Sequence, residues 1–313
     1  MKKKHLFRNL ILSIFLLASS KCFSEIQIIP NIGFSFGSMG EYLYSPYSDN
    51  LWSYLEWEEK PSISVGSNFL FKLKNNYFKF NIFFSLPLEC GKMTDSDWSE
   101  SGINYAYSVN ENKIKCAFRL ETEYNYEFYL NNFLSISPAA GIKFFYSSYK
   151  ARNGYGWYGT EEWSKNGELV SWNDDNAHYF PDEKYKLAGI DYSRCTLIFN
   201  TGFFFNFRLK KTKISAGFLF SPISYIYALD HHLGKTNSFK YEEIQYPVFK
   251  YYETTLEASY KINRLLKAYS KISYIFGLKS KGESYKNSSS KSYQKSGSDF
   301  YSAVFCAGLG FCF

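Results

Sequence analysis

The sequence predicts an all-β protein, a ten-stranded antiparallel β-barrel, on three observations. Apolar side chains recur at every second residue in ten separate segments, the pattern of a strand with one apolar and one polar face. The connections between these segments alternate between short and long, as in a membrane barrel with tight turns at one end and long loops at the other. No stretch approaches the roughly 18 uncharged apolar residues of a membrane helix.

Residues 1–24 are predicted to be a secretory signal peptide, which leaves residues 25–313 for the barrel. A basic start is followed by an apolar run over residues 10–18, and Cys22 and Ser24 are small residues suited to a cleavage site. The chain has a formal net charge of +7. The signal holds five basic residues and no acid, so the remainder is close to neutral. We therefore expect no binding of nucleic acid through bulk charge.

The predicted strands follow one another along the whole of the exported chain. In the fourth, the face with Ile114, Phe118 and Leu120 is apolar, while Lys115 and Arg119 on the other face require water or paired charges. The ten segments cover residues 26–36, 63–73, 78–88, 114–128, 134–144, 197–207, 214–220, 252–262, 266–278 and 301–313.

Two architectures could use such strands, a soluble sandwich and an outer-membrane barrel. Tight turns are predicted near residues 74–76, 131–132, 210–212 and 263–264, and the links between them are long. This alternation, the export signal and the terminal Phe313 favour an outer-membrane barrel with short periplasmic turns and long extracellular loops. Ten strands are too few for an open pore, so the function is expected at the rim.

Two short clusters could carry chemistry there. Asp95 and Asp97 lie at the end of the third predicted strand, where the first long upper segment after it begins. Residues two apart on a strand share a face, so both are expected to point the same way, and strand parity makes that face the lumen. Two carboxylates at one site can hold a shared proton or polarise a water. A solvated loop pair or a calcium ligand set is the alternative, although Glu100 stands where a calcium loop needs glycine.

The second cluster is Asp230-His231-His232. An Asp two residues from a His can hold the imidazole in one tautomer, as a general base requires. The alternative is a surface His beside an acid. Parity counted from Ile214 points Asp230 and His232 outward, so the functional interpretation needs a β-bulge near Pro222.

Together these clusters resemble the omptin family of outer-membrane endoproteases. Residues 91–98 are close to the family's GNMxDxDW stretch, and Asp230 to His232 match its DxH. Ala151-Arg152, the ending over residues 307–313 and the segment 41–44, which is similar to an E-x-x-Y pattern, extend the resemblance.

The resemblance implies a role for each matching residue. Asp230 would orient His232, and a water held between His232 and Asp95 would attack the peptide bond, with Asp97 as the partner of Asp95. Glu41, inward by parity, would form the acidic floor of the pocket for a basic substrate residue. No cofactor and no metal is implied. The active site would face the extracellular side of the outer membrane.

The sequence also departs from the family. Ala228 stands where the family has a second pocket acid, which predicts a weaker preference for basic residues. The family's lipopolysaccharide pattern is absent at residues 142–146, so we expect activity without lipopolysaccharide, or a different lipid contact through residues such as Lys143.

Three functions stay open from the sequence. The first is a membrane endopeptidase acting on polypeptides near basic residues. The second is a catalytically inactive barrel serving as an adhesin or receptor through the aromatic segment 146–185. The third is a small-solute channel, which ten strands disfavour.

Overall fold

The computed structural model describes residues 23–181, 189–233, 239–287, 289 and 291–313. Residues 1–22, which hold most of the predicted signal peptide, lie outside the described residues. Within the described ranges the chain is all-β, and it contains no helix long and apolar enough to cross a membrane.

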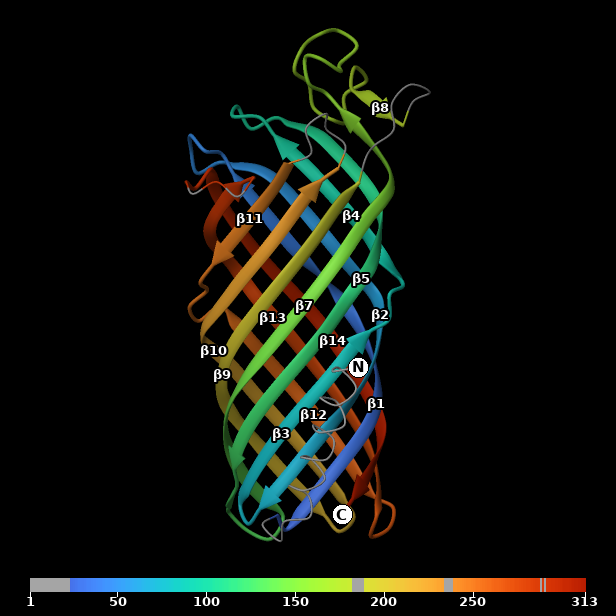
Figure 1. Ribbon diagram of the computed structural model, residues 1–313, viewed down its shortest axis with the longest axis vertical. Coiled ribbons are helices and arrows are strands. Elements are labelled where there is room, and N and C mark those ends of the chain that lie inside the picture. The colour runs from blue at the N-terminus through green and yellow to red at the C-terminus, as the bar shows by residue number, and fades with distance from the viewer. Residues whose placement is uncertain (1–22, 182–188, 234–238, 288, 290) are drawn as a thin grey trace, which may run out of the picture.

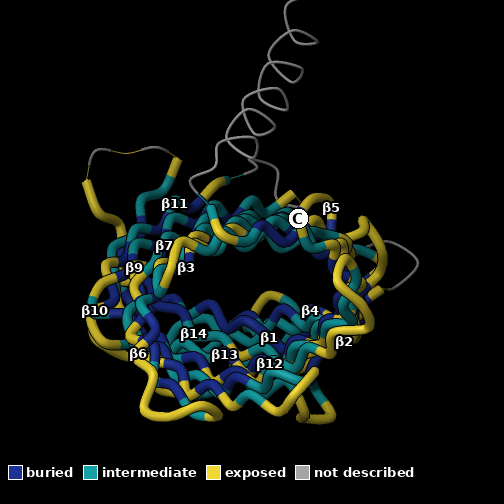
Figure 2. Tube along the Cα trace, turned by 90° about the horizontal axis from the view of Figure 1, so that it is seen from below, coloured by how far each residue is buried: buried dark blue, intermediate teal, exposed yellow. Residues whose placement is uncertain are grey.

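A single antiparallel sheet of 14 strands forms a ring (Figures 1 and 2). The ring closes because β5 pairs with both β3 and β7, while β1 pairs with β2 and β14. The strands are β1 (Glu25–Tyr44), β2 (Leu51–Leu73), β3 (Asn76–Ser85), β4 (Glu89–Trp98), β5 (Asn104–Tyr126), β6 (Phe128–Tyr129), β7 (Leu134–Tyr158), β8 (His178–Phe180), β9 (Ile190–Leu209), β10 (Thr212–His232), β11 (Phe239–Gln245), β12 (Tyr251–Lys261), β13 (Leu266–Lys286) and β14 (Gln294–Cys312).

The barrel is therefore confirmed, but the expected count of ten strands is not matched. β3 and β4 both pair with β2 and β5, and the break between them contains Pro87. β11 and β12 both pair with β10 and β13, and their break contains Pro247. Proline has no N–H for the ladder, which explains why each of these paths is split. β6 and β8 are further short strands paired with β7.

The connections alternate as predicted. At one end, the β2–β3 and β9–β10 turns pass through Lys74 and Lys210 with φ of 54° and 44°, the left-handed conformation of tight hairpins. In two other turns at this end, the side chains of Asn131 and Asn263 accept backbone N–H groups. The long loops lie at the opposite end, where the segment around β8 protrudes in Figure 1.

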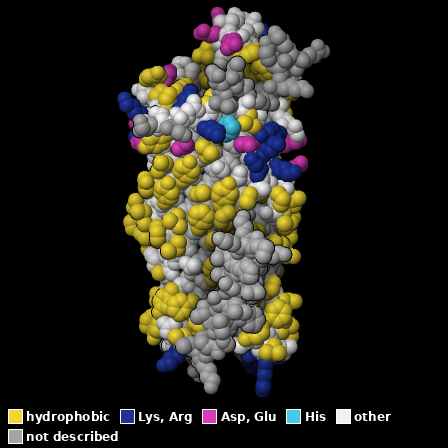
Figure 3. Space-filling view, viewed as in Figure 1, with side chains coloured by type: hydrophobic (Ala, Val, Ile, Leu, Met, Phe, Trp, Pro, Cys, Tyr) yellow, Lys and Arg dark blue, Asp and Glu magenta, His cyan; other side chains and the backbone are white. Residues whose placement is uncertain are grey.

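Apolar side chains form a belt around the outer wall. They are exposed, whereas a soluble protein would bury most of them in its core. Phe84, for example, is 50% exposed. Figure 3 shows these side chains over the middle and lower wall, with Lys and Arg side chains below them and charged side chains of both signs above. This is the surface of a barrel whose wall faces lipid. The belt includes Ile32, Phe34, Phe84, Phe203, Phe205, Ile272 and Phe305.

The inner wall is polar and holds paired charges. Arg119 Nε lies 3.1 Å from Glu121 Oε1, and Lys143 forms an ion pair with Glu253. Both members of the second pair are buried in the lumen. The expectation that Lys143 contacts lipid is therefore wrong, because its place on β7 points it to the inner face of the barrel.

The Lys143–Glu253 pair gives a stability prediction. Lys143→Met should lower the free energy of unfolding by about 3 kcal/mol, because it leaves the buried Glu253 carboxylate without its main cation. Urea unfolding of the barrel refolded in detergent, followed by tryptophan fluorescence, measures this. Lys150→Met, at an exposed site on the same strand, is the control and should change stability by less than about 0.5 kcal/mol. Equal effects of the two substitutions would contradict a structural role for the pair.

Candidate active site

The two acidic clusters lie at the long-loop end of the lumen, beyond the apolar belt. Asp95 and Asp97 are on β4, which begins only after the Pro87 break, and Asp230 and His232 end β10. At the level of Asp95 the neighbouring outward side chain on β2 is Glu56, whose cross-strand partner is Thr94. A charged outer wall at this height means that the site stands above the lipid-facing part of the barrel.

Asp95 and Asp97 both face the lumen, as predicted. They share the face of β4 that carries the fully buried Met93. The hydroxyl of Ser53 on β2 donates a 3.3 Å hydrogen bond to Asp95 Oδ1. Burial raises the pKa of Asp95 well above its ordinary value, and the negative charge of Asp97 raises it further. The pair is thus suited to holding a proton or a polarised water.

A β-bulge on β10 turns the second cluster inward. The register of β10 against β9 shifts between Phe220 and Ile223, so Pro222 lies within the irregularity. Before it, Ser215 and Leu219 are buried toward the lumen. After it, Ala228 and Asp230 are the residues buried toward the lumen. The predicted bulge is confirmed, and it reverses the parity that would have pointed Asp230 to the outside.

Asp230 and His232 are hydrogen-bonded to each other. His232 Nε2 lies 2.6 Å from Asp230 Oδ2, and the Asp230 side chain is fully buried while the imidazole remains 22% exposed. The ring of Phe239 stacks on the imidazole at a centroid distance of 5.0 Å. With a proton on Nε2 directed to the carboxylate, Nδ1 of a neutral imidazole is the acceptor that can take a proton.

The two clusters come together across the lumen. β4 and β10 are not neighbours in the ring, since β2, β1, β14, β13 and β11 lie between them. The charges of His232 and Asp230 nevertheless act on Asp95: that of His232 lowers the pKa of Asp95 and that of Asp230 raises it. The chemistry-bearing side chains from both clusters therefore share one electrostatic environment.

Glu41 lies beside them and is not the only carboxylate of its pocket. Trp57 Nε1 donates a 3.3 Å hydrogen bond to Glu41 Oε2. Glu243 on β11 is equally buried, and Gln245 Nε2 donates to Glu243 Oε2 at 3.4 Å. Glu41 and Glu243 are close enough for each to alter the other's pKa. The expectation of a single acid in this pocket, based on Ala228, is thus wrong.

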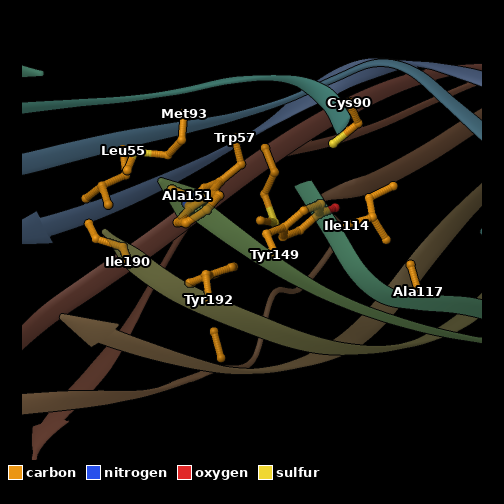
Figure 4. Close-up of a cluster of buried hydrophobic side chains, with 12 residues drawn as sticks. Leu55, Trp57, Cys90, Met93, Ile114, Ala117, Tyr149, Ala151, Ile190 and Tyr192 are labelled. Carbon is orange, nitrogen blue, oxygen red and sulfur yellow. The ribbon is translucent and has the colours of Figure 1, made fainter. Parts of the chain in front are cut away.

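Apolar side chains from several strands pack against one another inside the barrel, next to the site (Figure 4). The ring of Trp57 stacks on Tyr149 and Tyr192 at centroid distances of 5.7 and 5.1 Å. The cluster draws its members from β1, β2, β4, β5, β7, β9 and β10. This cluster, called the packed floor below, borders the polar site.

Two further residues that match the family pattern, Ala151 and Arg152, lie in different surroundings. Ala151 is buried in the packed floor, whereas Arg152 forms an ion pair with Asp191. Glu243 was missed from the sequence, although Tyr241, Glu243 and Gln245 alternate along β11 in the manner of a strand with a polar inner face. Across the described residues, no group of three His, Cys, Asp or Glu side chains is arranged to hold a metal ion.

Comparisons with known proteins agree with this architecture. The sequence profile of the Omptin family matches residues 23–313. Among solved structures, the outer membrane protease OmpT from Escherichia coli is similar with a TM-score of 0.77 and 17% identity, covering 94% of this chain and 99% of OmpT. The translocator domain of the autotransporter NalP from Neisseria meningitidis covers 98% of this chain and 95% of its own, with a TM-score of 0.36 and 8% identity.

No curated protein sequence matches significantly. The family match extends over nearly the whole chain, and the fold shared with OmpT covers 94% of it. The chain therefore belongs to the omptin family and is an outer-membrane β-barrel.

Proposed function

We propose that the protein is an endopeptidase of omptin type, which cleaves polypeptides near basic residues by means of a water activated by Asp230 and His232. The active site faces the extracellular side, because the long-loop end of such barrels is extracellular and the short turns are periplasmic. The Asp230–His232 hydrogen bond, directed toward a lumen that also holds Asp95 and Asp97, is the observation that carries this proposal.

In the proposed reaction the nucleophile is water. Asp95, with Asp97 as its partner, accepts a hydrogen bond from the water and fixes its position. His232 Nδ1 takes one proton as the oxygen attacks the substrate carbonyl, and the imidazolium is stabilised by Asp230. The proton then passes to the leaving amine, so His232 returns to its starting state. No covalent enzyme intermediate forms, because water rather than a side chain is the nucleophile.

Cleavage of peptide libraries by the refolded barrel tests the proposal. Products cut beside Lys or Arg are expected, and incorporation of oxygen from labelled water into the new carboxyl group during a single turnover is expected without a trapped acyl-enzyme. The same assay with the His232→Ala variant shows whether the activity belongs to this site. Absence of cleavage in the intact barrel would contradict the proposal.

Outer-membrane lipid is a proposed partner of the wall, but lipopolysaccharide is not proposed as an activator. At the positions corresponding to the family's lipopolysaccharide pattern, Ile142 is exposed and apolar and Lys143 is paired inside the lumen. We expect the barrel refolded in detergent to cleave peptides at the same rate with and without added lipopolysaccharide. Strict dependence on lipopolysaccharide in this assay would contradict the expectation.

One observation favours a second candidate function, an adhesin or receptor. Aromatic rings of β5, β7 and the segment leading to β8 pack together at the long-loop end, where Tyr107 contacts Trp157 and Trp172, and Trp157 contacts Tyr179. Aromatic clusters of this kind are frequent in protein recognition. Undiminished binding of a host protein by the Asp95→Ala, His232→Ala double variant would support this function.

A further inference from the structure

Two buried carboxylates meet next to the catalytic cluster. Glu41 on β1 and Glu243 on β11 are both 0% exposed. Within the described part of the chain, no other group donates a hydrogen bond to Oε1 of Glu41 or to Oε1 of Glu243, and the two carboxyl groups are placed to hydrogen-bond to each other. Buried carboxylate oxygens of this kind need a proton or a positively charged partner.

The side chains that donate hydrogen bonds to the pair are uncharged. Trp57 of β2 donates to the second oxygen of Glu41, and Gln245 of β11 to the second oxygen of Glu243. β13 and β14 face the pair with uncharged Ser284 and Ser298 at the paired positions. Neutral donors thus occupy only one oxygen of each carboxylate.

The charged neighbours act in opposite directions. Asp230 of β10 raises the pKa of both carboxyl groups, while Arg194 of β9 lowers that of Glu243. The charges of Glu41, Glu243, Arg194 and Asp230 also act on Tyr192 of β9. Burial dominates, and it raises the pKa of Glu41 well above its ordinary value and that of Glu243 to about 7. The Arg194 charge therefore does not offset the cost of two ionised carboxylates.

The register of the sheet explains where the second acid comes from. Ala228 on β10 is the cross-strand partner of Glu243 on β11, and both side chains are buried on the inner face. Side chains directly opposite on one face have Cβ atoms about 5 Å apart. The small Ala228 side chain leaves room for the Glu243 carboxylate. The second negative charge of the pocket therefore comes from β11 and not from β10.

We infer that Glu243 is a specificity-determining residue, and that Glu41 and Glu243 together hold one proton before substrate binds and exchange it for the cation of a Lys or Arg side chain. This rests on the proposed endopeptidase function. Two carboxylates with one proton carry the same net charge as two carboxylates with one ammonium or guanidinium. Binding therefore releases one proton to solvent and leaves the buried charge unchanged.

Competition between proton and substrate cation makes the preference depend on pH. Below the pKa of the pair the substrate cation has to displace the proton. Above that pKa the proton has already left. The ratio of kcat/KM for a peptide with Lys at the cleavage site to that for the matched Gln peptide should rise as pH increases from about 6 to about 8. The Gln peptide corrects for any pH effect on the catalytic step itself.

The test compares the Lys-to-Gln ratio in three proteins. Glu243→Gln should lower it at least about tenfold at pH 8, because a buried hydrogen bond to a charged group is lost, and should flatten its rise with pH. Glu242→Gln removes the adjacent carboxylate on the opposite face of β11 and should behave as the unaltered protein. A ratio unchanged by Glu243→Gln, or one that does not vary with pH, would overturn the inference.

A charge-relocation variant checks that the carboxylate itself is needed. Combining Glu243→Ala with Ala228→Asp returns an acid from the cross-strand position and should restore most of the ratio lost in Glu243→Ala alone. This outcome separates loss of charge from a general distortion of β11. Failure of the restored acid to raise the ratio in a folded barrel would count against a shared two-carboxylate pocket.

A binding measurement keeps this inference separate from the hydrolytic proposal. Calorimetric titration of the His232→Ala barrel with the Lys peptide, in buffers of different ionisation enthalpy, measures proton release without turnover. At about pH 6, below the pKa of Glu243, about one proton should leave on binding of the Lys peptide and none with the Gln peptide. If the intact barrel cleaves nothing but this result holds, the hydrolytic proposal fails while the pocket stands. Binding without proton release would reject the pocket mechanism alone.

Discussion

His232→Ala is expected to lower kcat/KM for peptide cleavage by at least about a hundredfold, the usual scale of a lost general base. The imidazole couples a buried carboxylate, Asp230, to the lumen through a 2.6 Å hydrogen bond. Its removal leaves the water without the base that takes its proton in the proposed reaction. Steady-state cleavage of a fluorogenic Lys peptide by the refolded variant measures the loss.

Matched variants distinguish catalysis from folding in this experiment. His231→Ala changes the neighbouring imidazole, which alternates to the other face of β10, and should retain activity. Asp230→Asn keeps the shape of the dyad but removes the charge that stabilises the imidazolium, so it should also lose at least about tenfold. A folded His232→Ala barrel with near-normal kcat/KM would contradict the proposed mechanism.

The strand pattern was predictable because one physical demand repeats along the chain. Each strand that faces lipid on one side and a polar lumen on the other must alternate, and Phe84 and Phe205 mark the lipid face as clearly in the sequence as on the wall. The strand ends were less predictable. Beyond the belt both faces meet polar surroundings, so the alternation weakens there, and β11 was not recognised as a strand.

Those features of the site that depend on a single strand could be predicted from the sequence. The spacing of Asp95 and Asp97 gives their common face, and Pro222 gave a reason to place a bulge before Asp230. Contacts between side chains on different strands could not be predicted in this way. That Glu243 lies opposite Ala228, or that Lys143 meets Glu253, follows from register and closure of the ring, which no single segment encodes.

Asp97→Asn is expected to move the acid limb of the pH–kcat/KM profile to lower pH. The negative charge of Asp97 is the second-largest cause, after burial, of the raised pKa of Asp95. A raised pKa keeps the Asp95 carboxyl group protonated up to a higher pH, where it cannot accept a hydrogen bond from the water. Without the neighbouring charge that proton leaves at lower pH, while burial still holds the pKa of Asp95 above an ordinary value of about 3.9.

A variant at the neighbouring position separates this electrostatic effect on Asp95 from a disturbance of the strand. Ser96→Ala, on the outer face of β4, should leave the limb in place. An acid limb unmoved by Asp97→Asn would place Asp97 outside the electrostatic environment of the catalytic water and reduce the proposed site to Asp95, Asp230 and His232.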